Sequence, residues 1–296
     1  MRTRQAFIAL TFLAVLWACA PSNEITSTPT LDPPPFTPTI AATATAIPPS
    51  PTPTPLGCLS QPGTVEQDSI TTTKPAPEFQ IYLPPCYEEL NDRQYPVLYL
   101  LHGQTYTDDQ WVRMGAGDIA SRLIISGETP PFIIVFPDDR YWNLQPGPGF
   151  GERLINLIIP HVDENYRTLA DREHRALGGL SRGGGWTLRL GFTHPELFGA
   201  LGLHSPAIFK EDASSINRWT RSIPDDKRPS VWLDIGDHDK ELNYSRLVET
   251  ILSNNDYLYE YHVYSGDHTE SYWSLHVEEY LRWYASQWDE PANVAQ

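Results

Sequence analysis

The chain has 296 residues, of which 21 are basic and 37 are acidic, so its formal net charge is −16. This acidic balance argues against nucleic-acid backbones and anionic lipid surfaces as partners, because like charges repel. Hydrophobic residues make up 40% of the sequence, and a body of about 240 residues can form one large α/β domain.

The first residues predict a signal segment rather than part of the fold. A basic start, MRTR, precedes the apolar run AFIALTFLAVLWA, which is too short to span a bilayer as a mature helix. LWAC at 16–19 resembles the lipobox of bacterial lipoproteins, in which the cysteine, here Cys19, is lipidated. Alternatively, ACA fits an A-x-A cleavage site and free secretion. We favour a lipoprotein signal peptide over residues 1–19, and both interpretations place the protein outside the cytoplasm.

Residues 20–56 are rich in proline, threonine and alanine, as in PPPFTPTIAATATAIPPSPTPTPL. Such a composition cannot bury a core, and proline keeps the chain extended. We expect a linker that holds the following domain away from a cell surface, and the alternative is a plain disordered tail. The folded domain is expected over 57–290, followed by a tail at 291–296.

Two cysteines, Cys58 and Cys86, remain if Cys19 is lipidated. Two cysteines left over in an oxidising compartment often pair. We therefore expect a disulfide between the start of the domain and the end of an early strand. Two buried free thiols are the alternative.

Apolar runs alternate with amphipathic stretches from residue 59 onwards. The later strands are almost continuously apolar, as expected when both faces of a parallel sheet are covered. The alternation predicts an α/β fold with a doubly wound, mostly parallel sheet of about eight strands and an antiparallel N-terminal edge. Functional groups of such a sheet lie in loops at the carboxyl ends of its strands. The expected strands are 69–73, 78–84, 97–102, 132–137, 174–180, 200–205, 231–236 and 259–265, and the expected helices are 117–126, 152–166, 186–194, 240–254 and 271–288.

The stretch GGLSRGGG at 178–185 places one serine, Ser181, at a predicted strand-to-helix junction. It contains G-x-S-x-G, which is a weak motif by itself but at such a junction is typical of a nucleophile on a strained turn. Glycines two residues away give the strand and the helix room to approach each other. The helix N-terminus directs its positive end at any anion formed there. Ser181 is therefore the predicted nucleophile.

A serine nucleophile needs a base, and the base needs an orienting acid. In this fold class the three follow in the order Ser, Asp or Glu, His. His268 lies in a loop after the last expected strand, whereas His262 falls within that strand and His276 within a helix. His268 is therefore the predicted base.

The acid should lie in the loop after the strand at 231–236, where the sequence reads VWLDIGDHDK. We choose Asp239 over Asp237, because Asp239 stands farther out of the strand and can reach across. Asp237 is the alternative, with an Asx-turn as its structural role. Asp234 lies inside the strand and is expected to be structural or a hydrogen-bonding residue that faces a helix.

The third requirement of acyl transfer is an oxyanion hole. One donor is expected to be the backbone N–H of Arg182, which follows the nucleophile. The second is expected from Gln104, after the strand that ends in His102 and Gly103, since glycine permits a tight turn. His102 is expected to fix this loop by hydrogen bonding rather than to act in catalysis.

The domain contains longer motifs in a fixed order: YLPPCYEELNDRQYPVLYLLHG, IIPHVDENYRTLADREHRALGGLSRGG, HPELFGALGLHSPA, IGDHD and GDHTESYW. In these motifs the chain, from about residue 60 to 290, resembles the esterase D family of α/β-hydrolases. This family includes feruloyl esterases, enterochelin-type siderophore esterases, S-formylglutathione hydrolases and mycolyltransferases. Many relatives carry Gly where this chain has Cys86, which supports the pairing with Cys58. The resemblance implies the α/β-hydrolase fold and five site residues, Ser181, Asp239, His268, Gln104 and Arg182.

Aromatic residues in the loops that follow strands are candidates to line the substrate cleft. They would receive an aromatic acyl group or a sugar, and the alternative for each is packing in the core or at the rim. The expected cleft residues are Tyr106, Trp111, Trp142 and Trp273, with Tyr141 and Trp186 as further candidates.

These residues together predict an extracytoplasmic serine carboxylic-ester hydrolase that acts through an acyl-enzyme. We expect no cofactor and no metal, a small-molecule or polysaccharide-linked ester as substrate, and a membrane contact through the N-terminal lipid. An acyltransferase would use the same triad with another acceptor in place of water. A metal hydrolase built on residues 237–239 and 267–268 is disfavoured, because adjacent residues seldom converge on one ion. A non-catalytic binding domain is disfavoured by the complete triad.

Overall fold

The computed structural model describes residues 57–139 and 149–288. The expected signal peptide with Cys19, the linker at 20–56 and the tail at 291–296 lie outside the described residues. Tyr141 and Trp142, two of the expected cleft aromatics, also lie outside them.

Eight strands of the described part form one sheet in the order β1-β2-β4-β3-β5-β6-β7-β8. The six strands from β3 to β8 are parallel, whereas β2 pairs antiparallel with both β1 and β4. The predicted fold class, a mostly parallel sheet with an antiparallel N-terminal edge, is confirmed. The strands are β1 (Thr64–Ser69), β2 (Glu78–Leu83), β3 (Val97–Leu101), β4 (Ile133–Pro137), β5 (Arg175–Leu180), β6 (Ala200–His204), β7 (Ser230–Gly236) and β8 (Tyr259–Tyr264).

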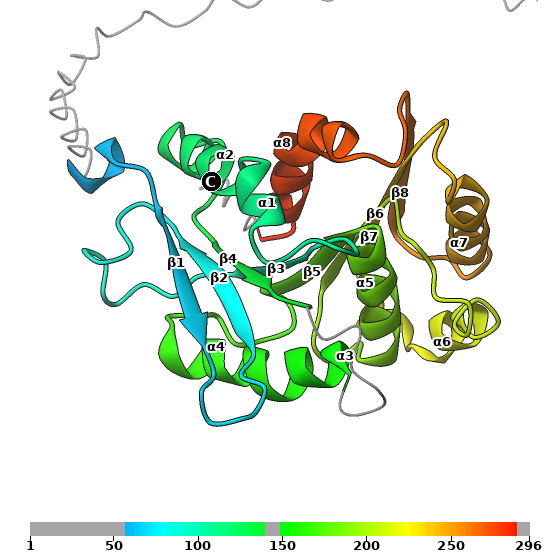
Figure 1. Cartoon of the computed structure of the whole chain (residues 1–296), viewed down its shortest axis with the longest axis horizontal. Helices are drawn as coiled ribbons and strands as arrows, with labels where there is room; N and C mark the ends of the chain where they lie inside the picture. Colours follow the sequence, from blue (N-terminus) through cyan, green and yellow to red (C-terminus); the bar gives the residue numbers. More distant parts are fainter. Residues whose placement is uncertain (1–56, 140–148, 289–296) are drawn as a thin grey trace, which may run out of the picture. The chain divides into compact units, whose positions relative to one another are not determined.

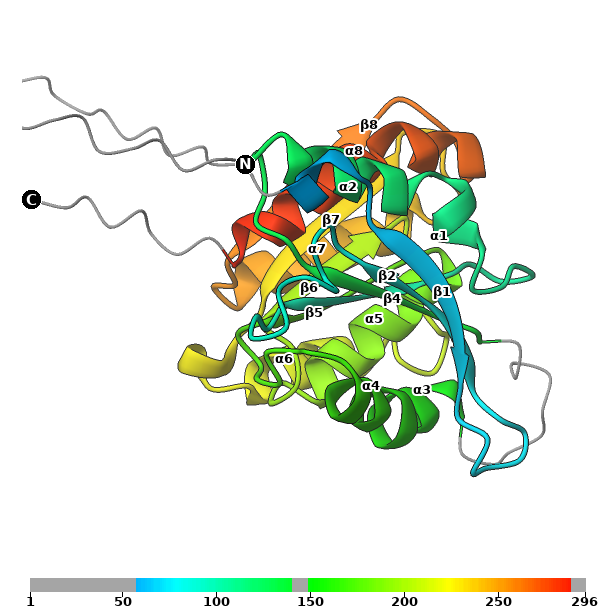
Figure 2. The ribbon, with the colours of Figure 1, turned by 90° about the vertical axis from the view of Figure 1, so that its left-hand side faces the viewer.

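Helices cover both faces of the sheet, as Figures 1 and 2 show. Each face has its own cluster of buried apolar side chains. One face carries α1 (Gln110–Arg113), α2 (Ala116–Ile125) and α8 (Glu270–Ser286). The other carries α3 (Phe150–Arg153), a π-helical turn (Leu154–Ile158), α4 (Ile159–Asn165), α5 (Arg182–Thr193), α6 (Ile216–Ser222) and α7 (Leu242–Asn254).

The first strand lies earlier than expected. The strand predicted at 69–73 is wrong, since β1 spans Thr64–Ser69 and residues 70–77 connect it to β2. β1 is an edge strand whose side chains are mostly exposed, so TVEQDS lacks the apolar pattern that marks a buried strand. The short helices α1 and α6 were not expected, and the helix expected at 186–194 begins at Arg182.

The C-terminal helix α8 is fixed to the sheet by a buried carboxylate, Asp234 of β7. Its Oδ2 accepts hydrogen bonds from the hydroxyls of Tyr272 (2.9 Å) and Tyr280 (2.7 Å), both on α8. Burial raises the pKa of both tyrosines far above the usual value, so their hydroxyls stay protonated and donate. The prediction that Asp234 faces a helix and accepts hydrogen bonds is confirmed. This contact holds α8, which begins directly after the loop of His268.

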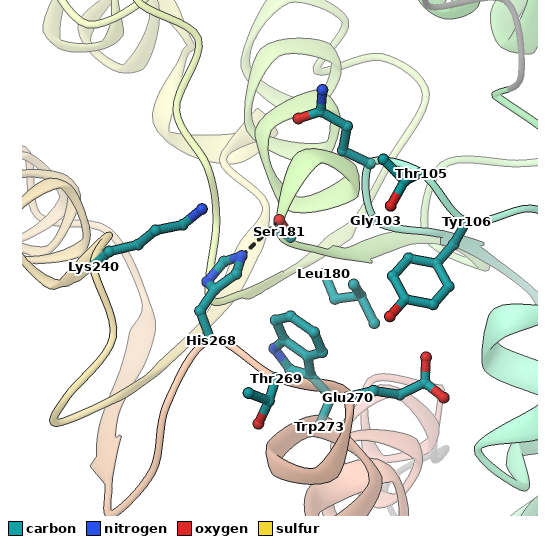
Figure 3. A pocket seen from close by; sticks show the side chains of 11 residues that line it. Gly103, Thr105, Tyr106, Leu180, Ser181, Lys240, His268, Thr269, Glu270 and Trp273 are labelled. Atoms are coloured by element: carbon teal, nitrogen blue, oxygen red, sulfur yellow. Dashed lines mark hydrogen bonds between the residues drawn. The ribbon is translucent and has the colours of Figure 1, made fainter.

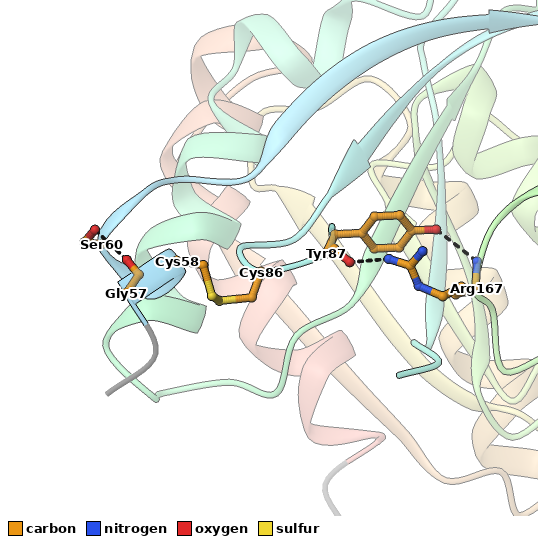
Figure 4. Close-up of a disulfide and its surroundings, with 6 residues drawn as sticks. All are labelled: Gly57, Cys58, Ser60, Cys86, Tyr87 and Arg167. Carbon is orange, nitrogen blue, oxygen red and sulfur yellow. Dashed lines mark hydrogen bonds between the residues drawn. A yellow bond between two sulfur atoms is a disulfide. The ribbon is translucent and has the colours of Figure 1, made fainter. Parts of the chain in front are cut away.

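A disulfide joins Cys58 to Cys86, as expected (Figure 4). It links the segment before β1 to the turn after β2. Cys86 has a φ of 64°, in the left-handed region that favours glycine. The next residue, Tyr87, is held by Arg167, whose guanidinium lies over its ring and donates to its carbonyl oxygen.

Replacing both Cys58 and Cys86 by serine should lower the free energy of unfolding by about 3 kcal/mol, because the closed loop has a sequence separation of 28 and its closure restricts the unfolded chain. Urea unfolding of the variant and the oxidised protein measures the difference. Ser60→Ala, which removes only an exposed hydroxyl bonded to a neighbouring carbonyl, is the control. Equal midpoints for the double variant and the wild type would contradict the prediction.

Candidate active site

The backbone at Ser181 has the strained conformation expected of a nucleophile turn. Ser181 lies between β5 and α5 with φ 53° and ψ −117°, a combination that a residue with a side chain rarely adopts. Its N–H donates to the carbonyl of His204 (2.9 Å), and its own carbonyl accepts from Gly185 (3.0 Å) and Ala207 (2.8 Å). These three hydrogen bonds hold the strained residue from both sides.

The glycines around Ser181 are required by close backbone contacts. A Cβ on Gly179 would lie 2.5 Å from the carbonyl carbon of Gly183, and one on Gly183 would lie 2.3 Å from the carbonyl oxygen of Leu101. A Cβ on Gly185 would lie 2.3 Å from the carbonyl oxygen of Ala207. The sequence-based interpretation is confirmed, since these glycines clear space for the strand, the helix and the loops that meet at Ser181.

Gly179→Ala should lower the free energy of unfolding by about 1–3 kcal/mol, because its methyl group would strike backbone that cannot rotate away. We also expect about a 100-fold loss of esterase activity, since a small displacement of a reacting group is costly. Gly57→Ala is the control, because a Cβ at Gly57 has nothing within 4 Å. Urea unfolding and ester hydrolysis are measured for both. If Gly179→Ala had the same free energy of unfolding and the same rate of ester hydrolysis as Gly57→Ala, the steric argument would be contradicted.

Three side chains from separate loops meet beside this turn. Nε2 of His268 lies 2.7 Å from Oγ of Ser181, and Nδ1 of His268 lies 2.8 Å from Oδ2 of Asp239. Figure 3 shows the contact between Ser181 and His268 at the wall of a cavity. His268 packs edge-on against Trp273 at 5.0 Å between ring centres, which limits its rotation.

The two carboxylates of the β7–α7 loop have different partners. Asp239 is 5% exposed, and its Oδ1 accepts the N–H of Glu241 (2.8 Å), which leaves Oδ2 for His268. Asp237 instead accepts the N–H of Gly266 (2.9 Å) and makes no Asx-turn of its own. The structure therefore brings Asp239, and not Asp237, to the imidazole.

This arrangement fixes the tautomer of His268. A carboxylate can only accept, so the proton on the imidazole lies on Nδ1 and is donated to Asp239. Nε2 then carries a lone pair and accepts from the hydroxyl of Ser181. Such a chain can take the hydroxyl proton as the oxygen attacks a carbonyl, and it can stabilise the imidazolium that forms.

The expected oxyanion donors flank Ser181. Arg182 is the first residue of α5, where backbone N–H groups point out of the helix, and Gln104 lines the same cavity as Ser181. His102 is buried, and its Nε2 lies 2.8 Å from the N–H of Asp139 while its Nδ1 lies 2.7 Å from the carbonyl oxygen of Gly103. His102 therefore stabilises the loop by hydrogen bonding.

The cavity at Ser181 has a volume of about 410 Å³. Of the expected aromatics, Tyr106 and Trp273 line it. Trp111 does not, because it is 1% exposed and its Nε1 donates to the carbonyl of Leu101 (3.0 Å) in the core. Its place next to a loop suggested exposure, but it lies in the short helix α1 and packs against the sheet. Trp186 lines two neighbouring cavities, one of them with Arg182.

A buried carboxylate, Asp139, lies beside the first residue of α5 and was missed in the sequence. Its Oδ2 is 2.9 Å from the guanidinium of Arg182 and accepts from Nε1 of Trp186 (3.0 Å). Burial raises the pKa of Asp139 to about 6, although the neighbouring Arg182 and His102 act to lower it. Its position two residues after β4, at the carboxyl edge of the sheet, is the signal that could have indicated it.

Among residues 57–139 and 149–288, no group of three or more His, Cys, Asp or Glu side chains is arranged to hold a metal ion. Over the same two ranges, no helix is both long enough and apolar enough to cross a bilayer.

Comparison with known proteins places the chain in a family. Residues 70–284 match the Esterase family model, described as "Putative esterase". An endo-1,4-beta-xylanase/feruloyl esterase of Xylanibacter ruminicola is 36% identical over 140 residues, which are 44% of this chain and 19% of that protein. An esterase of Mycobacterium tuberculosis is 32% identical over 152 residues, 48% of this chain and 32% of that protein. The matches thus span less than a third of either relative.

Solved structures agree with this family. A ferulic acid esterase superposes with a TM-score of 0.69 at 26% identity, covering 77% of this chain and all (100%) of that one. A ferulic acid esterase of Anaeromyces mucronatus, solved with ferulic acid, has a TM-score of 0.62 at 22% identity and covers 75% of this chain and 90% of that one, a likeness of fold alone. The chain therefore belongs to the esterase family through its residues 70–284, and it has the α/β-hydrolase fold.

Proposed function

We propose that this protein is an exported serine esterase that hydrolyses carboxylic esters through an acyl-enzyme on Ser181. The observation that carries the proposal is the unbroken chain of hydrogen bonds from Ser181 through His268 to Asp239, at 2.7 and 2.8 Å. The strained turn and the glycines that make room for it support the same role for Ser181.

The reaction has two halves. Oγ of Ser181 attacks the ester carbonyl while Nε2 of His268 takes its proton, and the N–H groups of Gln104 and Arg182 stabilise the negative oxygen. The ester C–O bond then breaks, and His268 returns the proton to the departing alcohol. In the second half water gives a proton to His268 and attacks the acyl-enzyme, which releases the acid and restores Ser181. Asp239 keeps His268 in the required tautomer throughout.

The substrate class that fits best is an ester of an aromatic acid such as ferulic acid, free or linked to a polysaccharide. Tyr106 and Trp273 supply aromatic surface to the cavity at Ser181, and aromatic rings bind both phenolic acids and sugars by stacking. A relative named as a feruloyl esterase and a solved structure named as a ferulic acid esterase support this class.

Export is the second part of the proposal. The disulfide between Cys58 and Cys86 favours an oxidising compartment, because cytosolic thiols are kept reduced. The N-terminal sequence supports export with lipid attachment at Cys19, although that residue lies outside the described part of the chain. Globomycin, which blocks lipoprotein signal cleavage, should cause accumulation of the precursor, and a Cys19→Ala variant should lose its fatty-acid label.

The activity is tested with a panel of esters presented to the purified domain. Methyl ferulate, feruloylated arabinoxylan oligosaccharides, p-nitrophenyl acetate and p-nitrophenyl butyrate are compared by kcat/KM. We expect the feruloyl esters to be preferred, and a fluorophosphonate to label Ser181, as read by peptide mass spectrometry. Hydrolysis that persists after complete labelling of Ser181 would refute the proposed nucleophile, and equal kcat/KM for all four esters would refute the proposed substrate class.

A further inference from the structure

A buried glutamine, Gln110, has no part in the chemistry described so far. It begins α1 and is 0% exposed. Its Oε1 accepts the backbone N–H of Gly103 at 2.8 Å, and its Nε2 donates to Oε2 of Glu270 at 3.2 Å. One amide group thus connects the nearby turn at Gly103 to Glu270, which lies 160 positions after Gln110 in the sequence.

The first of these segments is the turn that carries the expected oxyanion donor Gln104. Gly103 has both of its backbone polar groups held by side chains, its N–H by Gln110 and its carbonyl by Nδ1 of His102 at 2.7 Å. In a trans peptide the carbonyl of one residue and the N–H of the next point in opposite directions. Holding the Gly103 carbonyl toward His102 therefore directs the Gln104 N–H away from it. No backbone carbonyl of the turns and loops among the described residues accepts that N–H.

The turn is close enough to the nucleophile for its position to matter. A Cβ on Gly103 would lie 3.7 Å from Cβ of Ser181, and Gln104 lines the same cavity. An oxyanion donor acts within about 2.7–3.1 Å of the developing charge. A small shift of Gly103 would therefore move the Gln104 N–H out of range.

The second segment carries the base. Glu270 is the first residue of α8 and follows His268 by two positions, and Figure 3 shows both at the cavity with Gly103 on a separate loop. Nη1 of Arg113 donates to Oε1 of Glu270 at 2.8 Å, which fixes the carboxylate that Gln110 contacts. Gln110 thus joins the turn of the oxyanion donor to the loop of the base.

We propose that Gln110 is a positioning residue. Its hydrogen bonds to Gly103 and Glu270 hold the Gln104 N–H at a fixed position relative to Ser181 and His268. The proposal rests on the proposed function. A glutamine is suited to this role, because one planar group offers an acceptor to a backbone N–H and a donor to a carboxylate. Since the oxyanion forms only during the reaction, Gln110 should affect the transition state more than substrate binding.

The test compares two variants of the purified protein. Gln110→Met keeps the length of the side chain but makes neither hydrogen bond. We expect kcat to fall about 10- to 100-fold with KM within about twofold, and the affinity for phenylboronic acid, which forms a tetrahedral adduct with the serine, to fall by a similar factor. Ser121→Ala is the matched control, since Ser121 is also buried and bonds Gly63 and Tyr82 away from the cavity. It should lower the melting temperature and leave kcat unchanged.

A second pair of variants keeps the inference testable if Gln110→Met does not fold. Gln110→Glu alone places two carboxylates against each other and should lose at least tenfold in kcat. Adding Glu270→Gln reverses the donor and acceptor of the pair, preserves the net charge and should recover most of that loss. Equal kcat for the single and double variants would overturn the proposal, as would a folded Gln110→Met with wild-type kcat and boronate affinity. If Ser181→Ala retained activity, the proposed function itself would have failed instead.

Discussion

Ser181→Ala is expected to lower kcat for ester hydrolysis by ~10⁴- to 10⁶-fold, because the covalent pathway is lost and only the binding groups and oxyanion donors remain. The hydroxyl that this change removes is the one hydrogen-bonded to His268 at 2.7 Å. Alanine fits the site without a clash, so the fold should persist. Hydrolysis of methyl ferulate and p-nitrophenyl acetate measures the loss of kcat. Circular dichroism on the same samples shows whether the fold persists.

The control for this variant is Ser271→Ala. Ser271 is exposed near the start of α8, three residues after His268, and its hydroxyl contacts that of Thr269 (2.9 Å). It should retain kcat within about twofold, since surface substitutions of this kind are usually mild. A fluorophosphonate should label Ser271→Ala and not Ser181→Ala. Substantial turnover by Ser181→Ala would contradict the proposed mechanism.

The features that the sequence predicts well are those set by local rules. The buried strands β3 to β6 are almost continuously apolar, and a doubly wound sheet brings their carboxyl ends to one edge. Ser181, Asp239 and His268 follow the parallel strands β5, β7 and β8 in chain order, so their meeting could be expected from topology alone. The glycines at 179, 183 and 185 are explained by the same junction.

The features that the sequence predicts poorly depend on tertiary contacts. β1 is an exposed edge strand, and its register is set by pairing with β2 rather than by an apolar pattern. Trp111 follows a loop, but its burial depends on the short helix α1 and on the face that α1 presents to the sheet. Gln110 contacts a residue 160 positions away, and nothing in the local sequence distinguishes it from a surface glutamine.

Asp239→Asn is expected to lower kcat by ~10⁴-fold, because it places the imidazole of His268 in the wrong tautomer. The orientation of the new amide is set by Glu241, whose N–H donates to Oδ1 at 2.8 Å. The amide oxygen should stay at that N–H, so the NH₂ group replaces Oδ2 and faces Nδ1 of His268. Nδ1 must then accept, and the ring proton moves to Nε2, which can no longer take the proton of Ser181.

Asp237→Asn provides the matched control on the same loop. Asp237 accepts the N–H of Gly266 at 2.9 Å, and an asparagine oxygen can accept that bond equally well. Its kcat should therefore stay within about threefold of wild type, while KM and the folded state of both variants remain close to normal. The two substitutions are chemically identical and lie two residues apart. A difference between the kcat values of the two variants therefore reports on the contact with His268. A larger loss in Asp237→Asn than in Asp239→Asn would show that the orienting acid is Asp237.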